Sequence, residues 1–345
     1  MRRFLLTACL ALFSAQTVLA VEFDRALFMR MAMTTVRIEA LAPDNHYNMG
    51  TGVIVAPGRV VTSCHVTGPA PLIRVLYSGL RLTVRKQRHD IHNDLCMLEV
   101  PELEGVPAEV GSSSTLHVGD RVIAMGFTGG YELQFADGVV RGLYPDAGAP
   151  VIKSSTAFNS GSSGGGLFDA EGKLVGILTF RLRGTGDCYY SMPVDHFKTW
   201  LGSSDGFVEP TLLNAEVPVW QAPYEKQPLF LQAAFLELVK DWSKLQMLAN
   251  DWTHQDPGSA VAWLTLGKAY AGMHATQDSI PPFQKATDLE PQLGEAWYEL
   301  ALAAQSSGHD EELVSIRQKL EVIDPDLALQ LDSKLSLLTE AKPQK

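Results

Sequence analysis

The sequence has few cysteines and no long apolar run beyond its first residues. Its 345 residues contain four cysteines, Cys9, Cys64, Cys96 and Cys188, which are too few for a small fold held together by disulfide bonds. After Ala20, no stretch of eighteen consecutive apolar residues occurs. We therefore expect a hydrophobic core to hold the fold, and no membrane insertion of the chain beyond that point.

Basic residues are also scarce. Lysine and arginine number 28 against 39 aspartates and glutamates, which gives a formal net charge of −11. A surplus of negative charge repels phosphate backbones and anionic lipid surfaces. The composition therefore argues against nucleic acid as a partner.

The first twenty residues have the pattern of an export signal. Arg2 and Arg3 precede the apolar run "FLLTACLALF", and "VLA", ending at Ala20, supplies the small residues of a cleavage site. A lipoprotein signal is the alternative, because "LTAC" ending at Cys9 looks like a lipobox, but the apolar run continues past that cysteine. We predict that residues 1–20 are a bacterial signal peptide and that the protein is exported to the periplasm or another extracytoplasmic space.

Along the remaining chain, the composition and the hydrophobic period change twice. Residues 33–201 form short runs rich in β-branched residues, separated by Gly, Pro, Asn or Asp, which is typical of an antiparallel barrel or sandwich. Residues 202–228 carry four prolines and no sustained period, which indicates an ordered or semi-extended linker. We therefore place a β-domain at 21–201 and a linker at 202–228.

The C-terminal part, 229–341, is helical and repetitive. Pro257, Pro291 and Pro325 recur every 34 residues, and so do Trp263 and Trp297. A repeat of this length indicates stacked helix pairs, each of which buries an apolar face against its neighbour. A generic helical bundle is the alternative, and the common phase of prolines and tryptophans argues against it.

The segment "WLTLGKAY" resembles the signature of the tetratricopeptide repeat, W-x2-L-G-x2-Y. Phe283, Ala286 and Pro291 follow at the offsets of that family. The resemblance implies an α-helical solenoid with repeats at about 229–259, 260–293 and 294–327 and a capping helix at 328–340. Its first and last copies are degenerate, as terminal repeats of a solenoid are expected to be.

The stretch "FNSGSSGGGLFD" between Phe158 and Asp169 is the strongest chemical signal. A flexible linker is the alternative, but apolar strand-like residues follow at once. A nucleophilic serine needs a base, an orienting acid and backbone donors for the oxyanion. His65 in "GRVVTSCHV" and Asp94 in "HNDLCMLEV" supply the base and the acid, and with Ser163 they occur in the order His, Asp, Ser.

Five segments between residues 33 and 201 resemble the trypsin-like serine peptidases, and among them the HtrA/Deg type. The segments are "GTGVIVAPGRVVTSCHV", "NDLCMLEV", "GSSSTLHVGDRVIAMGF", "GSSGGGLFDAEGKLVGILTF" and "YYSMPVDHFKTWL". The resemblance implies a double antiparallel β-barrel with Ser163 as nucleophile, His65 as base and Asp94 as the acid that orients it. It also implies an oxyanion hole from the N–H groups of Gly161 and Ser163, and neither a metal nor an organic cofactor.

The same resemblance places the substrate-binding wall. The residues implied are Phe158, Asn159, Thr179, Phe180, Arg181 and Tyr190. Ala157 stands where a trypsin-type aspartate would lie and has no charge. An apolar residue, rather than arginine or lysine, is therefore expected on the acyl side of the cleaved bond.

The cysteines next to the expected triad can be interpreted in two ways. Cys64 directly precedes His65, and Cys96 follows Asp94 by two residues. We interpret both as small buried apolar side chains, with a bridge between them as the alternative. Cys188 is expected to be the exposed thiol.

Two further features receive structural interpretations. His89 and His92, with Asp90 and Asp94, could hold zinc, but no further cluster with ligand spacing accompanies them, and a polar turn is preferred. The tryptophans outside the repeat signature are expected to pack in cores or at the domain interface: Trp200, Trp220, Trp242 and Trp252.

Together these features predict a multidomain β-plus-α protein that is a serine endopeptidase acting on proteins or peptides. The repeats are expected to dock a protein partner, a substrate or a second copy of the chain, or to hold the enzyme locked until their groove is filled. The alternative function is a catalytically silent scaffold, although such a protein would not need all three triad residues.

Overall fold

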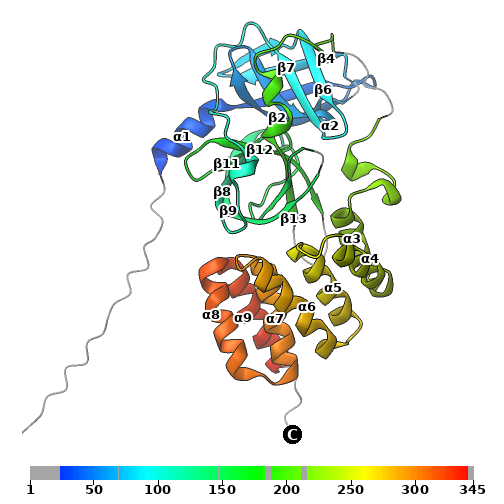
Figure 1. The fold of residues 1–345 in the computed structure, drawn as a ribbon. Coiled ribbons are helices and arrows are strands. Elements are labelled where there is room, and N and C mark those ends of the chain that lie inside the picture. Colours follow the sequence, from blue (N-terminus) through cyan, green and yellow to red (C-terminus); the bar gives the residue numbers. More distant parts are fainter. Residues whose placement is uncertain (1–23, 69, 147, 183–187, 211–215, 341–345) are drawn as a thin grey trace, which may run out of the picture.

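The protein is described by a computed structural model over residues 24–68, 70–146, 148–182, 188–210 and 216–340. Two β-units stack on one another, and an array of helices lies below the second unit (Figure 1). The predicted signal peptide at 1–20 and the side chain of Cys188 lie outside the described residues. Among the residues described, no helix is both long and apolar enough to cross a membrane.

The first β-unit is a seven-stranded antiparallel sheet in the order β5-β4-β1-β2-β3-β7-β6. Its strands are β1 Thr35–Leu41, β2 Tyr47–Ala56, β3 Arg59–Ser63, β4 Leu72–Tyr77, β5 Leu80–Thr83, β6 Lys86–Asp90 and β7 Leu95–Glu99. A helix, α1 Arg25–Thr34, precedes the sheet, and the sequence patterns did not predict it. The Asp24 side chain caps α1 by accepting hydrogen bonds from the N–H groups of Ala26 and Leu27.

The second β-unit is a closed barrel in the order β10-β13-β12-β11-β8-β9. Its strands are β8 Arg121–Thr128, β9 Glu132–Tyr144, β10 Val151–Ser154, β11 Gly166–Asp169, β12 Leu174–Leu182 and β13 Cys188–Pro193. The prediction was a double antiparallel β-barrel followed by helices, and its multidomain β-plus-α class is confirmed, with the second unit as a closed barrel. The first unit is an open sheet rather than a closed barrel, because its edge strands β5 and β6 pair with β4 and β7 but not with each other.

One hydrophobic core joins the two β-units. Val53 and Met97 of the first sheet belong to the same buried cluster as Met125, Phe168 and Ile177 of the barrel, and all five side chains are fully buried. Burying such a side chain contributes about 1.5–3 kcal/mol. The two units are therefore held firmly against each other, with β3 and β12 meeting at the seam.

The helical part consists of consecutive antiparallel helices, each packed against the next. They are α3 Leu229–Leu238, α4 Trp242–Gln255, α5 Ala260–Gly272, α6 Thr276–Leu289, α7 Gly294–Ser307, α8 Asp310–Ile323 and α9 Pro325–Glu340. The same Pro–Trp hydrogen bond recurs in two successive repeats, 34 residues apart. The indole N–H of Trp263 donates to the carbonyl of Pro257, and that of Trp297 donates to the carbonyl of Pro291, each at 2.9 Å.

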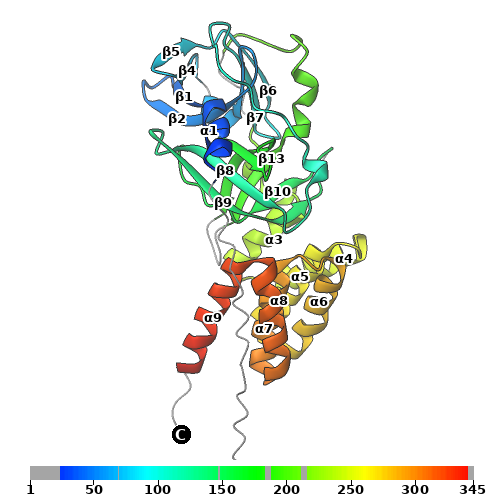
Figure 2. The same ribbon diagram turned by 90° about the vertical axis from the view of Figure 1, so that its left-hand side faces the viewer.

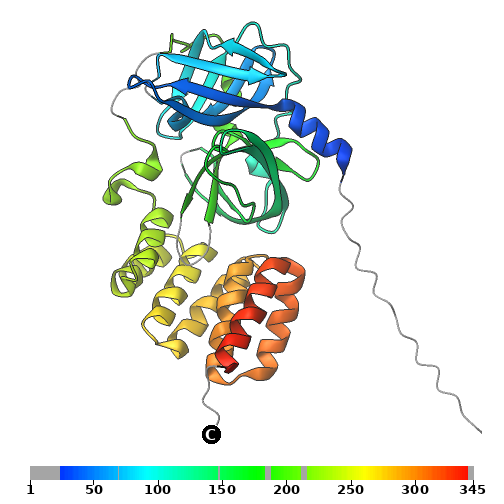
Figure 3. The same ribbon diagram turned by 180° about the vertical axis from the view of Figure 1, so that it is seen from behind.

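The segment between the domains is ordered where it is described. It contains two short 3₁₀ turns, Val219–Gln221 and Tyr224–Lys226. It descends along the side of the β-units to α3, as seen from opposite directions in Figures 1 and 3. In its described parts, 202–210 and 216–228, the linker predicted at 202–228 packs along the β-units.

Buried ion pairs fasten the barrel to the helices. Lys153 of β10 pairs with Glu295 of α7 at 2.7 Å, and Glu295 also pairs with Lys268 of α5. Burial alone would lower the pKa of Lys268, but Glu237 and Glu295 outweigh it and hold that pKa above its ordinary value. These contacts fix the barrel of the second β-unit above the helical array, an arrangement that is clearest in Figure 2.

A cavity of about 630 Å³ lies between the barrel and the alternate helices α3, α5, α7 and α9. Glu299 of α7 lines it, together with Lys268 and Glu237. Burial raises the pKa of Glu299 to about 7, with Lys268 opposing the rise and Glu295 and Glu237 adding to it. This carboxyl group therefore stays protonated in the folded chain at pH values where an unfolded chain has already released the proton.

Replacing Glu299 by glutamine is expected to stabilise the protein at pH 8 by about 1 to 3 kcal/mol and to change little at pH 4. The folded chain binds the extra proton between about pH 4.5 and 7, so the free energy of unfolding of the wild type falls as the pH rises through that window. Thermal unfolding of both proteins across this range measures the difference. Glu311→Gln, at an exposed position of α8, is the matched control, and equal pH dependence of wild type and Glu299→Gln would contradict the expectation.

Candidate active site

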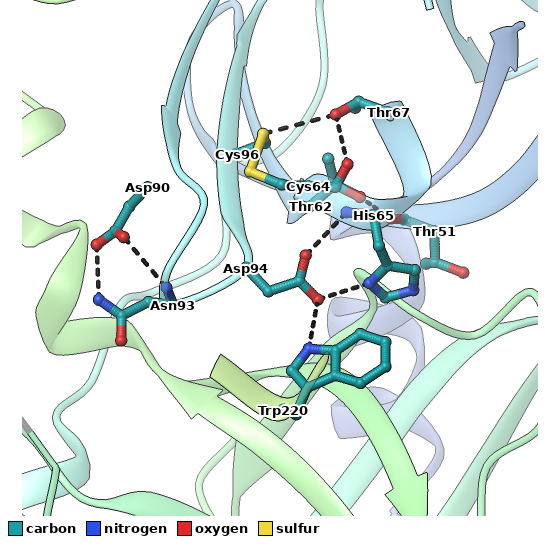
Figure 4. The surroundings of a disulfide bond; sticks show 10 residues. All are labelled: Thr51, Thr62, Cys64, His65, Thr67, Asp90, Asn93, Asp94, Cys96 and Trp220. Atoms are coloured by element: carbon teal, nitrogen blue, oxygen red, sulfur yellow. Dashed lines mark hydrogen bonds and ion pairs between the residues drawn. A yellow bond between two sulfur atoms is a disulfide. The ribbon is translucent and has the colours of Figure 1, made fainter. Parts of the chain in front are cut away.

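The structure brings His65 and Asp94 together at the seam of the two β-units. His65 Nδ1 lies 2.6 Å from Asp94 Oδ2, and the backbone N–H of His65 donates to Asp94 Oδ1 at 2.8 Å (Figure 4). The Asp94 side chain is fully buried, whereas that of His65 is 27% exposed. The carboxylate can therefore fix the tautomer and orientation of an imidazole whose other nitrogen remains accessible.

Local backbone structure accounts for this pairing. β3 ends at Ser63, and the single helical turn α2, Cys64–Thr67, carries His65 away from the sheet. Asp94 lies directly before β7, which pairs with β3, and it has a left-handed backbone with a φ of 56°. Aspartate tolerates this conformation better than most residues, and it turns the carboxylate back toward the end of β3.

A disulfide bond joins Cys64 to Cys96 beside this pair. The interpretation of the two cysteines as separate apolar side chains is therefore wrong. In the β3–β7 ladder Thr62 pairs with Cys96, which brings Cys64, two residues further along, close to Cys96, and both side chains are buried. The bridge thus ties the segment that carries His65 to the segment that carries Asp94.

The double substitution Cys64→Ala and Cys96→Ala is expected to lower the free energy of unfolding by about 3 to 4 kcal/mol. The bridge spans a sequence separation of 32 residues, and closing a loop of that length restricts the unfolded chain by about this amount. Urea unfolding of the variant and of wild type, each with and without reductant, measures the effect. A variant as stable as oxidised wild type, or a wild type indifferent to reductant, would contradict it.

The loop with Ser163 is anchored to both β-units. Thr51 of β2 donates through its hydroxyl to the Gly161 carbonyl at 2.8 Å, and its backbone N–H donates to the Ser163 carbonyl at 2.9 Å. Gly164 has a φ of 84°, and a Cβ there would collide with the carbonyl of Thr51 and the hydroxyl of Thr62. Only glycine lets the loop approach the first sheet this closely, which places Ser163 beside the strand that leads to His65.

Two backbone donors at this loop have no protein acceptor. Within the part of the chain that the structure describes, the N–H groups of Gly161 and Ser163 donate no hydrogen bond. Gly161 has a φ of 94°, and the neighbouring N–H of Ser162 is used in a turn to the Asn159 carbonyl. Free N–H groups of a serine and of the residue two positions before it can stabilise an oxyanion that develops at that serine.

The Ser163 hydroxyl donates to the carbonyl of Thr179 at 3.3 Å and not to the ring of His65. Within the described residues, no hydrogen bond joins the Ser163 hydroxyl to the imidazole of His65. Catalytic hydrogen bonds are often long or misaligned until substrate binds.

The residues expected to bind substrate fall into two groups. Thr179, Phe180 and Arg181 lie on β12 beside the serine loop, and Arg181 donates to the Asn159 side chain at 2.8 Å. Phe158 and Tyr190 are buried, as are Thr179 and Phe180, and Tyr190 stacks on Phe180. The side chains of Asn159 and Arg181 therefore remain as the ones that can meet a bound peptide, and the buried group supports the wall.

Sequence reasoning missed a participant at this site, because Trp220 was expected only to pack in a core or an interface. Its indole N–H donates to Asp94 Oδ2 at 3.3 Å, and its ring contacts His65 edge to face with centroids 5.5 Å apart. Figure 4 shows the indole below the Asp94–His65 pair. No motif marks this tryptophan, since it lies in the proline-rich segment well after the β-domain.

The polar turn before Asp94 is occupied by local bonds. Asp90 accepts hydrogen bonds from the backbone N–H and the side-chain amide of Asn93, at 3.1 and 2.7 Å. Asp94 is used by His65, as described above. In the considered zinc cluster, Asp90 thus fixes the turn and Asp94 binds His65.

The sequence matches known families over the β-domain. Residues 50–177 match the family described as "Trypsin-like peptidase domain". A probable periplasmic DegP-like serine endoprotease of Hahella chejuensis is 34% identical over 163 residues, which is 44% of this chain and 34% of the relative. A relative of the same name from Pseudomonas savastanoi is 32% identical over 157 residues, 43% of this chain and 33% of its own length. The chain thus spans about a third of the length of these curated relatives.

Among solved structures, the active form of the Rv3671c protease from M. tuberculosis is similar over 55% of this chain and 89% of that protein. The two are 21% identical, with a TM-score of 0.48.

Proposed function

We propose that the protein is a serine endopeptidase that cleaves peptide bonds in proteins, since residues 50–177 match the family described as a trypsin-like peptidase domain. The observation that carries the proposal is the contact of 2.6 Å between His65 and a fully buried Asp94, next to a serine loop with free backbone donors. The sequence similarity to proteins named serine endoproteases supports it. No metal or organic cofactor enters the reaction.

In the proposed reaction, the Ser163 hydroxyl attacks the carbonyl carbon of the substrate while His65 Nε2 takes its proton. Asp94 holds the imidazole in the correct tautomer and stabilises the imidazolium that forms. The N–H groups of Gly161 and Ser163 stabilise the tetrahedral oxyanion. The imidazolium then gives its proton to the leaving amine, and water hydrolyses the acyl-enzyme by the same steps in reverse order.

The peptide would lie along β12. The Thr179 carbonyl, which accepts the Ser163 hydroxyl in the free protein, would instead accept an N–H of the peptide. Substrate binding would thus free the hydroxyl to turn toward His65. Asn159 and Arg181, joined to each other across the edge of this strand, would border the pocket for the residue before the cleaved bond.

The helices belong to the proposal as a docking unit of the tetratricopeptide type. The cavity between the barrel and α3, α5, α7 and α9 is the place where a peptide segment or partner would bind. Binding there would slow amide exchange in α5 and α7 and leave the first sheet unchanged. Unchanged exchange upon addition of a protein substrate would contradict docking in the cavity.

We also place the protein in the periplasm or another extracytoplasmic space. The relatives are named periplasmic, and a disulfide between Cys64 and Cys96 is stable in an oxidising compartment. Fractionation of cells that express the whole chain tests the location, and recovery of the protein in the cytoplasm with reduced thiols would contradict it.

The test of the activity is digestion of a chemically unfolded protein by the purified chain, with Ser163→Ala as the reference. New amino termini are identified by mass spectrometry, which gives the residue preference at the same time. Cleavage by wild type and none by the variant is expected. Equal product from both proteins would assign the cleavage to a contaminant, and no product from either would favour the silent scaffold.

A further inference from the structure

We propose that Trp220 is a positioning residue for the Asp94–His65 pair, supplied by the segment that joins the two domains. The inference rests on the proposed function, because the pair has a catalytic role only in a working peptidase. Three contacts carry it: a hydrogen bond to the carboxylate, an edge-to-face contact with the imidazole and a stack on a strand of the substrate cleft.

The hydrogen bond completes the surroundings of the carboxylate. Asp94 Oδ1 accepts the backbone N–H of His65, while Oδ2 faces His65 Nδ1 at 2.6 Å and accepts the Trp220 indole N–H at 3.3 Å. A fully buried carboxylate gains from each donor that faces it, and here the tryptophan is the donor that comes from outside the β-domain.

The ring contacts hold the imidazole in place. The indole of Trp220 meets the His65 ring at an interplanar angle of 85° with centroids 5.5 Å apart, and it stacks on Phe180 at 18° and 5.2 Å. An imidazole with a carboxylate at Nδ1 and an aromatic wall beside it has little freedom to rotate. A fixed ring keeps Nε2 where the serine proton must be received.

Trp220 lies in the segment between the β-domain and the helices, so its contact connects the catalytic pair to the chain beyond the β-domain. Val219, its neighbour, donates its N–H to the His92 carbonyl at 3.0 Å, which seats the turn of 219–221 against the segment that leads to Asp94. A row of aromatic rings continues from Trp220 through Phe180 and Tyr190 to Phe230 of α3. The chain beyond the β-domain therefore reaches the catalytic pair both through the linker backbone and through side-chain packing.

The test compares Trp220→Phe with wild type in the full chain. Phenylalanine keeps an aromatic ring against His65 and Phe180 and removes only the N–H donor. The matched control is Trp263→Phe, which removes an exposed indole hydrogen bond to a carbonyl within the helical part. Thermal unfolding of both variants verifies that they fold.

For Trp220→Phe, kcat with a peptide substrate is expected to fall about tenfold, equivalent to about 1.4 kcal/mol of activation free energy. KM should stay within about twofold of wild type, because the wall of the cleft remains. The low-field proton resonance of His65 Nδ1 is expected to shift and to exchange faster with solvent. Trp263→Phe should leave kcat and this resonance as they are in wild type.

Two results would overturn the inference. An unchanged kcat and resonance in Trp220→Phe would make the tryptophan a packing residue, and a higher kcat/KM would make it an obstruction of the cleft. The resonance is also recorded in the Ser163→Ala background, where no turnover occurs. A chain with no peptidase activity but with a resonance that responds to Trp220→Phe would contradict the proposed function and leave the positioning contact standing.

Discussion

Replacing Ser163 by alanine is expected to lower kcat for peptide hydrolysis by about 10⁶-fold. The activity that remains should be close to the limit of detection above spontaneous hydrolysis of the peptide. Removal of the nucleophile abolishes the acyl-enzyme route, and the remaining two members of a triad do not act independently. The substitution removes one half-buried hydroxyl whose present partner is the Thr179 carbonyl. The Ser163→Ala variant should therefore keep the wild-type fold and still bind substrate.

Ser162→Ala is the matched control for this variant. Ser162 is the adjacent residue, and its hydroxyl faces Thr128 at 3.3 Å rather than the catalytic pair. Activity in this variant should stay within about tenfold of wild type. If Ser162→Ala were inactive and Ser163→Ala active, the nucleophile would be misassigned.

Asp94→Asn is expected to lower kcat about 10⁴-fold at neutral pH. An amide of the same shape can donate to His65 Nδ1, which stabilises the tautomer that carries its proton on the wrong nitrogen. The imidazolium also loses its counter-charge. Because the side chain is fully buried next to the backbone N–H of His65, the near-isosteric change should leave the position of the imidazole nearly unaltered.

Asp90→Asn provides the control, four residues earlier in the same turn. Asp90 bonds only to Asn93 among the described residues, so its loss should affect stability more than kcat. Steady-state kinetics of both variants with one peptide substrate measure the contrast. A similar loss of kcat in the two variants would mean that charge near the site, rather than the bond to His65, is what matters.

The expected pairing of His65 with Asp94, and the strand–turn–helix segments around them, could be predicted because each lies in a contiguous motif. The glycines around Ser163 could be interpreted for the same reason, and the structure supplies the cause at Gly164, where a Cβ would collide with Thr51. The 34-residue period was also readable, since its prolines and tryptophans recur in phase, and the Trp263 indole binds the Pro257 carbonyl six residues before it. Each of these features marks a contiguous stretch of sequence, even where the partner of a residue, as for Gly164 and Thr51, is distant.

The features that were missed depend on contacts distant in the sequence. Cys64 and Cys96 were interpreted as two buried apolar side chains, with a bridge only as the alternative. Their neighbours His65 and Asp94 were already expected to touch, and this contact was the available signal for the bridge. Trp220 lies 126 residues after Asp94, and its segment has no periodic pattern. Only the folded arrangement shows which of the tryptophans reaches the carboxylate.

The helical domain illustrates the same limit. Its internal stacking was foreseen, but the ion pairs of Glu295 with Lys153 and Lys268 join residues whose partners are set by docking of one domain on the other. The cavity left between the domains, with the carboxyl of Glu299 whose pKa is raised by burial, is likewise a product of that docking. Composition and periodicity contain no information about either.

The most direct measurement is covalent labelling of the purified protein by a fluorophosphonate, with the modified residue located by mass spectrometry. This reagent reacts with a serine activated by a base and an oxyanion hole and does not require the natural substrate. The proposed function predicts a single adduct on Ser163 that is absent in Ser163→Ala and slowed in Asp94→Asn. An unlabelled wild type, or an adduct on another serine, would contradict it.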